Sequence, residues 1–222
     1  HFAHFLPDEL SIDGSITPEK RYRGIYEVVV YNSELILNGN FTKVDIDKLG
    51  LDKDNILWSQ ATLDLGISDL RSIQNDVSVD WAGEKLNFNP GVKTDDVVYT
   101  GISTDIEVND SVAKYEFNVS LNLNGSKGIY FTPLGKTTNV KLVSNWGDPK
   151  FNGSFLPDER NVSDTGFTAN WEVLHLNRNY PQEFIDDNNN IESSNFGVDL
   201  IMPVDEYRKS MRSVKYAVMF IS

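Results

Sequence analysis

Apolar and polar residues alternate along much of this chain. The clearest example is the segment 115–123, whose apolar positions are Tyr115, Phe117, Val119, Leu121 and Leu123. An alternation with a period of two is typical of a strand that buries one of its faces. Segments 77–81 and 167–173 repeat the pattern and place Trp81 and Trp171 on the buried face. Each of the three segments therefore predicts a half-buried strand.

Shorter apolar runs between turn-like residues predict further strands. These runs are Ile25–Tyr31, Glu34–Phe41, Ala61–Ile67, Val97–Ile102, Ile129–Pro133, Thr138–Ser144 and Phe196–Met202. The turn-like residues include Asn38-Gly39, Asn89-Pro90-Gly91, Asn124-Gly125 and Asn152-Gly153. Regularly spaced short strands without long helices between them favour antiparallel sheets packed face to face. We predict a mainly β fold, a large antiparallel β-sandwich.

Two segments have a helical pattern. Ser68–Gln74 predicts a short helical turn with Ser68 as its N-cap. The segment 203–222 predicts an amphipathic helix that begins at Pro203 and ends in the apolar run Tyr216–Ile221. This helix either packs on the sandwich or forms the first turns of a membrane span, which needs about 20 apolar residues. Its cations suit anionic lipid headgroups. They are Arg208, Lys209, Arg212 and Lys215.

Composition removes several classes of function. The 222 residues carry 20 Lys and Arg against 33 Asp and Glu, a net charge of −13, and such a field repels nucleic acid. The length fits one large domain or at most two small ones. The chain has no cysteine, which excludes disulfides, thiolate zinc sites and a cysteine nucleophile. It begins at His1 without a signal-like segment, so we expect an excised part of a longer protein.

A search for catalytic motifs gives little. The three histidines do not have the spacing of a metal site, and His175 continues an inward alternation, as expected of a core or edge residue. The polar run Asp186–Glu192 does not have the glycine and the final glutamate of a calcium loop. No phosphate-binding glycine loop or hydrolase elbow occurs. We therefore predict a non-enzymatic protein with no catalytic residues, metal site or cofactor.

The loop region from Trp146 to Arg160 is the predicted interaction surface. Its glycine, proline and aromatic residues suggest a specific geometry, and the candidate contact residues are Trp146, Phe151, Phe155 and Arg160. The alternative is that this motif closes one end of the sandwich. If Trp146 stacks with Phe151 or Phe155 at the surface, the chain is instead a carbohydrate-binding or envelope-glycan-binding module, or a degenerate glycan enzyme.

Five stretches of the chain, in order, resemble one protein family. They are "LPDELSIDGSITPEKRYRGIY" (Leu6–Tyr26), "LGISDLRSI" (Leu65–Ile73), "SNWGDPKFNGSFLPDER" (Ser144–Arg160), "GFTANWEVLHLNRNYPQ" (Gly166–Gln182) and "FGVDLIMPVDEYRKSMRSVKYAVMFI" (Phe196–Ile221). Together they resemble the CreD family of bacterial inner-membrane proteins, which is linked to envelope integrity and colicin tolerance. The resemblance covers nearly the whole chain.

This resemblance implies a periplasmic domain between membrane helices. Residues 1–202 would be the periplasmic β-sandwich, with 1–20 leading in from a preceding membrane helix, and 203–222 would begin the next one. The implied location is the bacterial inner membrane. The implied partners are the protein's own transmembrane bundle and the lipid bilayer, together with an envelope protein or glycan. The family offers no catalytic residues to transfer.

Overall fold

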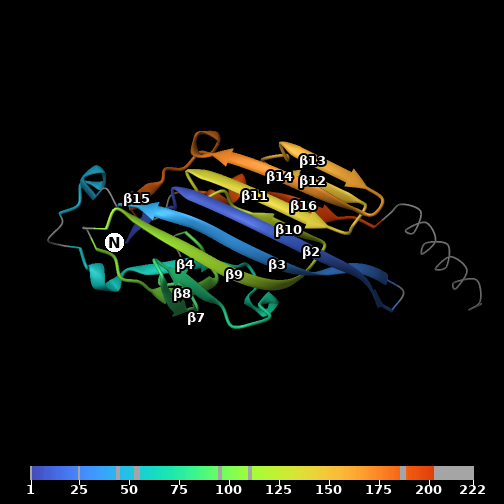
Figure 1. Ribbon diagram of the computed structural model, residues 1–222, viewed down its shortest axis with the longest axis horizontal. Coiled ribbons are helices and arrows are strands. Elements are labelled where there is room, and N and C mark those ends of the chain that lie inside the picture. Colours follow the sequence, from blue (N-terminus) through green and yellow to red (C-terminus); the bar gives the residue numbers. More distant parts are fainter. Residues whose placement is uncertain are drawn as a thin grey trace, which may run out of the picture.

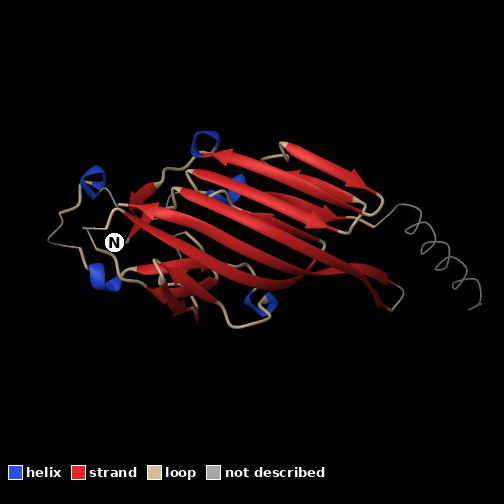
Figure 2. Cartoon of the chain, in the orientation of Figure 1, coloured by secondary structure: helices blue, strands red, loops and turns tan. Residues whose placement is uncertain are grey.

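The computed structural model describes residues 2–24, 26–43, 46–52, 56–94, 97–109, 112–185 and 189–202. Strands dominate the described chain, which confirms the mainly β fold (Figures 1 and 2). The predicted helix over 203–222, with Arg208, Lys209, Arg212 and Lys215, lies outside these ranges. Within them, no helix has the length and hydropathy needed to cross a bilayer.

One large sheet forms the main layer of the molecule. Its strands lie in the order β13 (Glu159–Ser163), β14 (Gly166–Leu174), β11 (Thr137–Ser144), β2 (Glu9–Arg23), β3 (Tyr26–Thr42), β9 (Lys114–Ser126), β5 (Ser78–Trp81) and β6 (Glu84–Asn87). Neighbouring strands are antiparallel except β2 and β11, which run parallel and pair Glu9 with Thr137. The pairing of β2 with β11 ends at Ile16, and from Lys20 onward β2 and β3 continue alone as a projecting ribbon.

Two small sheets cover one face of the large sheet. One has the order β10 (Gly128–Phe131), β16 (Phe196–Leu200) and β12 (Pro149–Gly153), and the other β4 (Thr62–Gly66), β8 (Gly101–Asp105) and β7 (Asn89–Pro90). Strands β1 (Ala3–Phe5) and β15 (Glu183–Ile185) form a separate pair. Short 3-10 turns connect the strands: η1 (Ile46–Leu49), η3 (Trp58–Gln60), η4 (Leu70–Ser72), η5 (His175–Asn177) and η6 (Ile191–Ser194).

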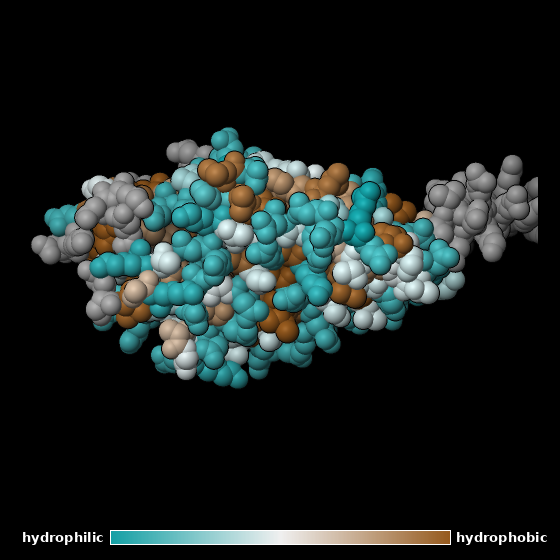
Figure 3. Space-filling view, turned by 45° about the horizontal axis from the view of Figure 1, so that its top comes forward, coloured by the Kyte–Doolittle hydropathy of each residue, from teal (hydrophilic) through white to brown (hydrophobic). Residues whose placement is uncertain are grey.

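The core lies between the large sheet and its covering sheets. Alternate residues of β9, including Tyr115, Val119 and Leu121, are buried there, as the sequence pattern predicts. Trp81 and Trp171 are buried in the same core, with 5% and 2% of their surface exposed. The opposite face of the large sheet carries polar residues with scattered apolar ones, and Figure 3 shows a mostly hydrophilic surface. Burial of one face therefore sets the register of each strand.

Several boundaries differ from the predictions. The two strands expected at Ile25–Tyr31 and Glu34–Phe41 are one continuous strand, β3. Residues 9–20, expected within the lead-in segment, belong to β2 near the middle of the large sheet. His175 starts the turn η5 rather than continuing β14. Asp69, not Ser68, caps the turn η4 by accepting a hydrogen bond from the Arg71 N–H.

Two predicted turns are also wrong, because their glycines lie inside long strands. A Cβ on Gly39 in β3 would come within 2.5 Å of the Phe117 ring, and one on Gly125 in β9 would come within 2.2 Å of the Tyr31 hydroxyl. These glycines leave room for aromatic rings on neighbouring strands, a known use of glycine within a strand. The Asn-Gly pairs therefore lie where an aromatic ring of a neighbouring strand comes close to the backbone, and not where the chain reverses direction.

Candidate functional site: a cleft between the covering sheets

A cleft of about 770 Å³ lies between the two covering sheets. In Figure 1 the covering strands follow one another in the order β12, β16, β10, β4, β8 and β7. The cleft is lined by all residues of β10 and, from the other side, by Asp64–Ile67 in and after β4. Both strands end their sheets on this side. The cleft therefore separates two strand edges that face each other.

Apolar side chains of the large sheet form the floor of the cleft. They come from β2, β3 and β9 and are Leu10, Ile12, Leu35, Leu37, Leu121 and Leu123. Leu35 and Leu121 are 5% and 3% exposed, so each reaches the cleft with only a small part of its surface. Ile67 and Ile129 contribute apolar walls from the two sides. Together they form an apolar base of which only a small part is exposed to the cleft.

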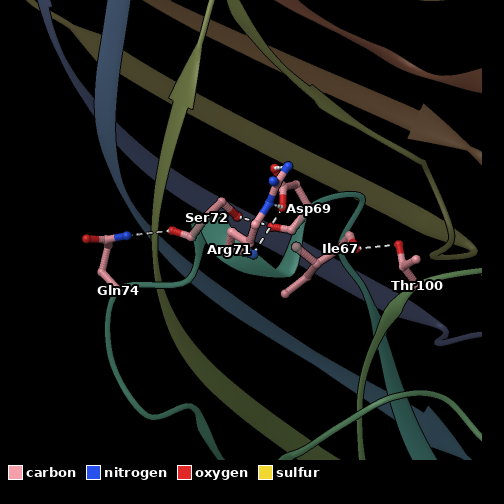
Figure 4. Close-up of polar contacts among 6 residues, drawn as sticks. All are labelled: Ile67, Asp69, Arg71, Ser72, Gln74 and Thr100. Carbon is pink, nitrogen blue, oxygen red and sulfur yellow. Dashed lines mark hydrogen bonds and ion pairs between the residues drawn. The ribbon is translucent and has the colours of Figure 1, made fainter.

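The rim of the cleft is polar and charged. Figure 4 shows the turn η4 at one end, where Arg71 forms an ion pair with Asp69, with a nitrogen–oxygen distance of 2.9 Å. This contact lowers the pKa of Asp69 and raises that of Arg71, chiefly through their side-chain hydrogen bond. Both side chains are largely exposed, so the pair contributes little to stability. Its charges are available at the mouth of the cleft.

The two strand edges carry one titratable side chain each. Asp64 on β4 is exposed, yet desolvation by the surrounding protein raises the pKa of its carboxyl, against the opposing effects of Thr62, His4 and Lys93. Tyr130 on β10 donates a hydrogen bond to Asp199 at 2.6 Å. Desolvation first, and then this hydrogen bond, raises the pKa of Tyr130.

Tyr31 connects the large sheet to the β10 side of the cleft. Its hydroxyl donates a hydrogen bond of 2.7 Å to the Gly128 carbonyl. The side chain is 8% exposed, and burial raises the pKa of Tyr31 to about 12. The folded state thus favours the neutral phenol, and this stabilisation is lost as the pH rises from the unfolded pKa of about 10 towards 12.

We expect the free energy of unfolding to fall between about pH 9 and about pH 11 by roughly 1 kcal/mol more in the wild-type chain than in Tyr31→Phe. The variant cannot ionise at this position, so the difference isolates Tyr31 from the other tyrosines. Urea denaturation at the two pH values measures it. Parallel pH dependence in both proteins would show that the Tyr31 phenol ionises equally easily in the folded and unfolded chains.

The predicted interaction residues lie elsewhere, at one end of the β12 side, and mostly pack inward. The Phe151 ring contacts Trp171 edge-on with a centroid separation of 5.7 Å, and Phe155 contacts Phe196 at 5.9 Å. The exposed Arg160 guanidinium lies 5.9 Å from the Phe151 ring. The fold thus places Arg160 with Phe151, while both rings extend the core. A role of these residues in binding a partner stays a prediction.

Trp146 is half-buried and held by the chain that follows β16. Its indole N–H donates a hydrogen bond of 2.9 Å to the Ile201 carbonyl, and the Lys20 ammonium lies 5.8 Å from its ring centroid. It does not stack on Phe151 or Phe155 in any ring contact of the described chain. These contacts suit a residue that ties the projecting ribbon and the end of β16 together.

A second hollow, of about 930 Å³, lies on the polar outer face of the large sheet. Amides and carboxylates from five strands line it, including Glu9, Asn38, Asp80, Glu116 and Asn139. Many are already paired with each other: the Asn40 amide donates to Glu9 at 2.6 Å, and Asn118 donates to Asn38. Within the described ranges, no three His, Asp or Glu side chains gather as a metal site would require.

The cleft has no signal of its own in the sequence, although the strands predicted at Ala61–Ile67 and Ile129–Pro133 contain β4 and most of β10. The signal for each strand is local. The signal for their juxtaposition is not, because β4 pairs with β8 and β10 with β16, both far away in the chain.

Comparison with known proteins identifies the family. The family model described as "Inner membrane protein CreD" matches residues 1–222. The inner membrane protein CreD of Escherichia coli (strain K12) is 31% identical over 228 aligned positions, which cover 100% of this chain and 49% of that protein. The chain thus spans about half the length of this curated relative.

Solved structures give only a distant likeness. An M1 zinc metallopeptidase from Deinococcus radiodurans is 8% identical, with a TM-score of 0.34 over 76% of this chain and 39% of the enzyme. A mutant of that enzyme gives a TM-score of 0.34 at 9% identity, over 77% of this chain and 38% of the enzyme. Such low scores carry no argument about fold or activity. Because the family model matches the whole length, this chain belongs to the CreD family of inner membrane proteins.

Proposed function

We propose that this chain is a non-enzymatic binding domain of a CreD-family inner membrane protein, exposed to the periplasm, that supports envelope integrity by holding an envelope protein in the cleft between its covering sheets. One observation carries the proposal: the cleft combines an apolar floor with a charged rim and two strand edges. Binding sites of proteins typically combine a concave apolar surface with a few placed polar groups.

The architecture supports a binding role for this cleft. Its floor is the inner face of the large sheet, whose apolar side chains belong to the packed hydrophobic core, so the base is rigid. Its walls come from two small sheets that share no hydrogen-bonded strand in the described chain. A partner seated between them would therefore contact a fixed floor and two separate walls.

The proposal is tested by crosslinking in cells that express the protein. A photoreactive phenylalanine analogue at Asp64, on the rim, is expected to capture a specific envelope protein. The matched position is Ile36, which is 46% exposed on β3 and points to the opposite face of the large sheet. Crosslinks from position 64 that are absent from position 36 support the proposal. Equal capture at both positions, or none at 64, overturns it.

The glycan-binding alternative is not favoured. It needed an exposed aromatic platform, whereas Phe151 and Phe155 pack edge-on against core rings and the Trp146 indole is tied to the Ile201 carbonyl. Sugars bind to aromatic faces that are free to stack. These three side chains do not combine into such a surface.

A further inference from the structure

We propose that the cleft binds an extended peptide segment, which inserts as an additional strand between β10 and β4 and joins the two covering sheets into one. The inference rests on the proposed function and specifies the chemistry of the bound partner. It follows from three features of the cleft: the hydrogen-bonding state of its edges, the directions of its two bordering strands and the character of its floor.

The β4 edge presents backbone groups to the cleft. The Ile67 N–H donates to the Thr100 carbonyl at 3.0 Å, and the Ala61 carbonyl accepts from the Ile106 N–H at 3.0 Å. The backbone N–H and C=O groups of the odd-numbered residues of this stretch therefore point towards β8. In an antiparallel ladder, the backbone groups of the intervening residues point the other way. The N–H and C=O groups of Asp64 and Gly66 therefore point away from β8. No strand of the described chain pairs with them.

The β10 edge has the same arrangement. The Lys127 carbonyl accepts a hydrogen bond from the Leu200 N–H at 2.6 Å. In this register, the backbone N–H and C=O groups of the odd-numbered residues of β10 point towards β16. The backbone groups of Gly128 and Tyr130 therefore point away from β16. The Gly128 carbonyl is taken by the Tyr31 hydroxyl, whereas Tyr130 presents both an N–H and a C=O. Edges with unpaired groups of this kind are templates for another strand.

The directions of the two strands allow one peptide to pair with both. In Figure 1, β4 runs from the turn that precedes it, η3, towards the turn that follows it, η4. Strand β10 turns back at the end of β9 and runs in the direction opposite to β4. An inserted strand would therefore be antiparallel to one edge and parallel to the other. Both kinds of ladder form regular hydrogen bonds. The strands have five and four residues, which matches a peptide segment of about five residues, or roughly 17 Å.

The floor determines which side chains the segment carries. Successive side chains of a strand point to opposite faces, so every second residue of the peptide would lie on the leucines below. Those residues are apolar, and the intervening ones face the charged rim of Asp64, Asp69 and Arg71. An alkyl chain could use the same floor, but it would enclose the edge N–H and C=O groups without partners, at a large cost. The edges thus favour a peptide over a lipid.

The test uses a panel of fluorescent, end-capped heptapeptides with Lys at both ends and alternating apolar (Val, Leu or Phe) and Ser or Thr residues between. Fluorescence anisotropy with the whole 222-residue chain measures their affinity. We expect saturable binding by at least one peptide. Backbone N-methylation of its apolar residues removes the N–H donors to one edge, and N-methylation of its Ser and Thr residues removes those to the other. Each modification should weaken binding about tenfold or more. Unchanged binding of both methylated forms would overturn strand insertion.

A pair of variants tests the protein side. Asp64→Pro removes the N–H that faces the cleft, at an edge position where proline is tolerated. Asp64→Asn keeps that N–H and removes only the charge. Both variants lack the carboxylate, so we expect the proline variant to bind the peptide about tenfold more weakly than the asparagine variant. Equal binding by both folded variants would contradict pairing at β4. Circular dichroism verifies folding, and if the proline variant unfolds, the methylated peptides still decide the question.

The remaining outcomes separate this inference from the proposed function. Crosslinking from position 64 in cells, combined with no binding by the peptide panel, would leave the binding domain standing and overturn strand insertion. Saturable binding of dodecanoate that displaces the peptides and matches their affinity would also overturn it, in favour of an apolar-chain site. Peptide binding that requires both edges, without a crosslink from position 64, would support strand insertion and overturn the envelope-protein role.

Discussion

Replacing Trp171 with alanine is expected to lower the free energy of unfolding by about 3–5 kcal/mol, among the largest effects of any single substitution in this chain. The side chain is 2% exposed and lies where the large sheet meets the β10-β16-β12 sheet. Its ring centroid is 5.7 Å from those of both Phe151 and Phe196. Its indole N–H has no hydrogen-bond partner within the described chain, so the loss is one of packing. Urea denaturation measures it.

Leu174→Ala is the matched control for Trp171→Ala. Leu174 is on the same strand, β14, but faces the other side of the sheet and is 39% exposed. Truncation there is expected to change stability by less than about 0.5 kcal/mol. If both substitutions destabilise the protein equally, the packing of the two layers at Trp171 is not as tight as the structure shows.

The second large effect is expected from Gly197→Ala in the central strand β16. An added Cβ would lie 2.1 Å from the Ile129 carbonyl oxygen and 2.8 Å from the Tyr130 Cα, both in the backbone of β10. Backbone atoms cannot rotate away as a side chain can, so β10 must move. We expect a loss of about 3 kcal/mol, the upper end of the range for overpacking. Urea denaturation measures this loss as well.

Gly14→Ala is the comparison for Gly197→Ala. There, the added Cβ would come too close only to side-chain atoms, the Cδ2 atoms of Leu142 and Leu35 at 2.6 and 2.9 Å, while the nearest backbone atom, the Lys141 carbonyl oxygen, lies at an ordinary 3.7 Å. Leucine side chains can adjust their rotamers, so we expect a loss of only about 1 kcal/mol. An equal cost at both glycines would mean that β10 yields as easily as a leucine side chain. Because β10 borders the cleft, Gly197→Ala should also weaken peptide binding at that edge.

The fold class could be predicted because burial imposes a period of two on the strands. Segments 77–81, 115–123 and 167–173 bury one face against the core, and each is a strand or most of one. Strand β2 escaped prediction for the converse reason. Leu10, Ile12 and Ile16 in its first half alternate and are buried, but its end, from Lys20, projects with β3 beyond the rest of the sheet, and exposed residues there such as Tyr22, at 77%, have no apolar period.

Glycines misled the local interpretation because their role here depends on distant residues. Asn38-Gly39 has the composition of a hairpin turn. What keeps this pair in an extended strand is its pairing with β2 on one side and β9 on the other, and the Phe117 ring of β9 occupies the space above Gly39. Tertiary packing therefore overrides a local preference that is worth only a small free energy.

The candidate site was less predictable than the fold. The sequence directs attention to conspicuous aromatic residues, and Phe151 and Phe155 turn out to complete a core whose other half lies in β14 and β16. The cleft residues Asp64, Gly66 and Tyr130 have no distinctive local pattern. Their relevance comes from two strand edges left without neighbours, and edge positions depend on which remote strands pair.

The parallel pairing of β2 with β11 has a consequence for the order of folding. The ribbon formed by β2 and β3 can close early, since its residues are adjacent in the chain. The other side of β2 must wait for Thr137–Ser144 to be synthesised. Contacts over such long loops are slow to form, and all-β domains of this kind fold in roughly milliseconds to seconds. Until β11 pairs with β2, the nascent chain has an exposed strand edge at the later centre of its largest sheet. During this period the chain is vulnerable to aggregation.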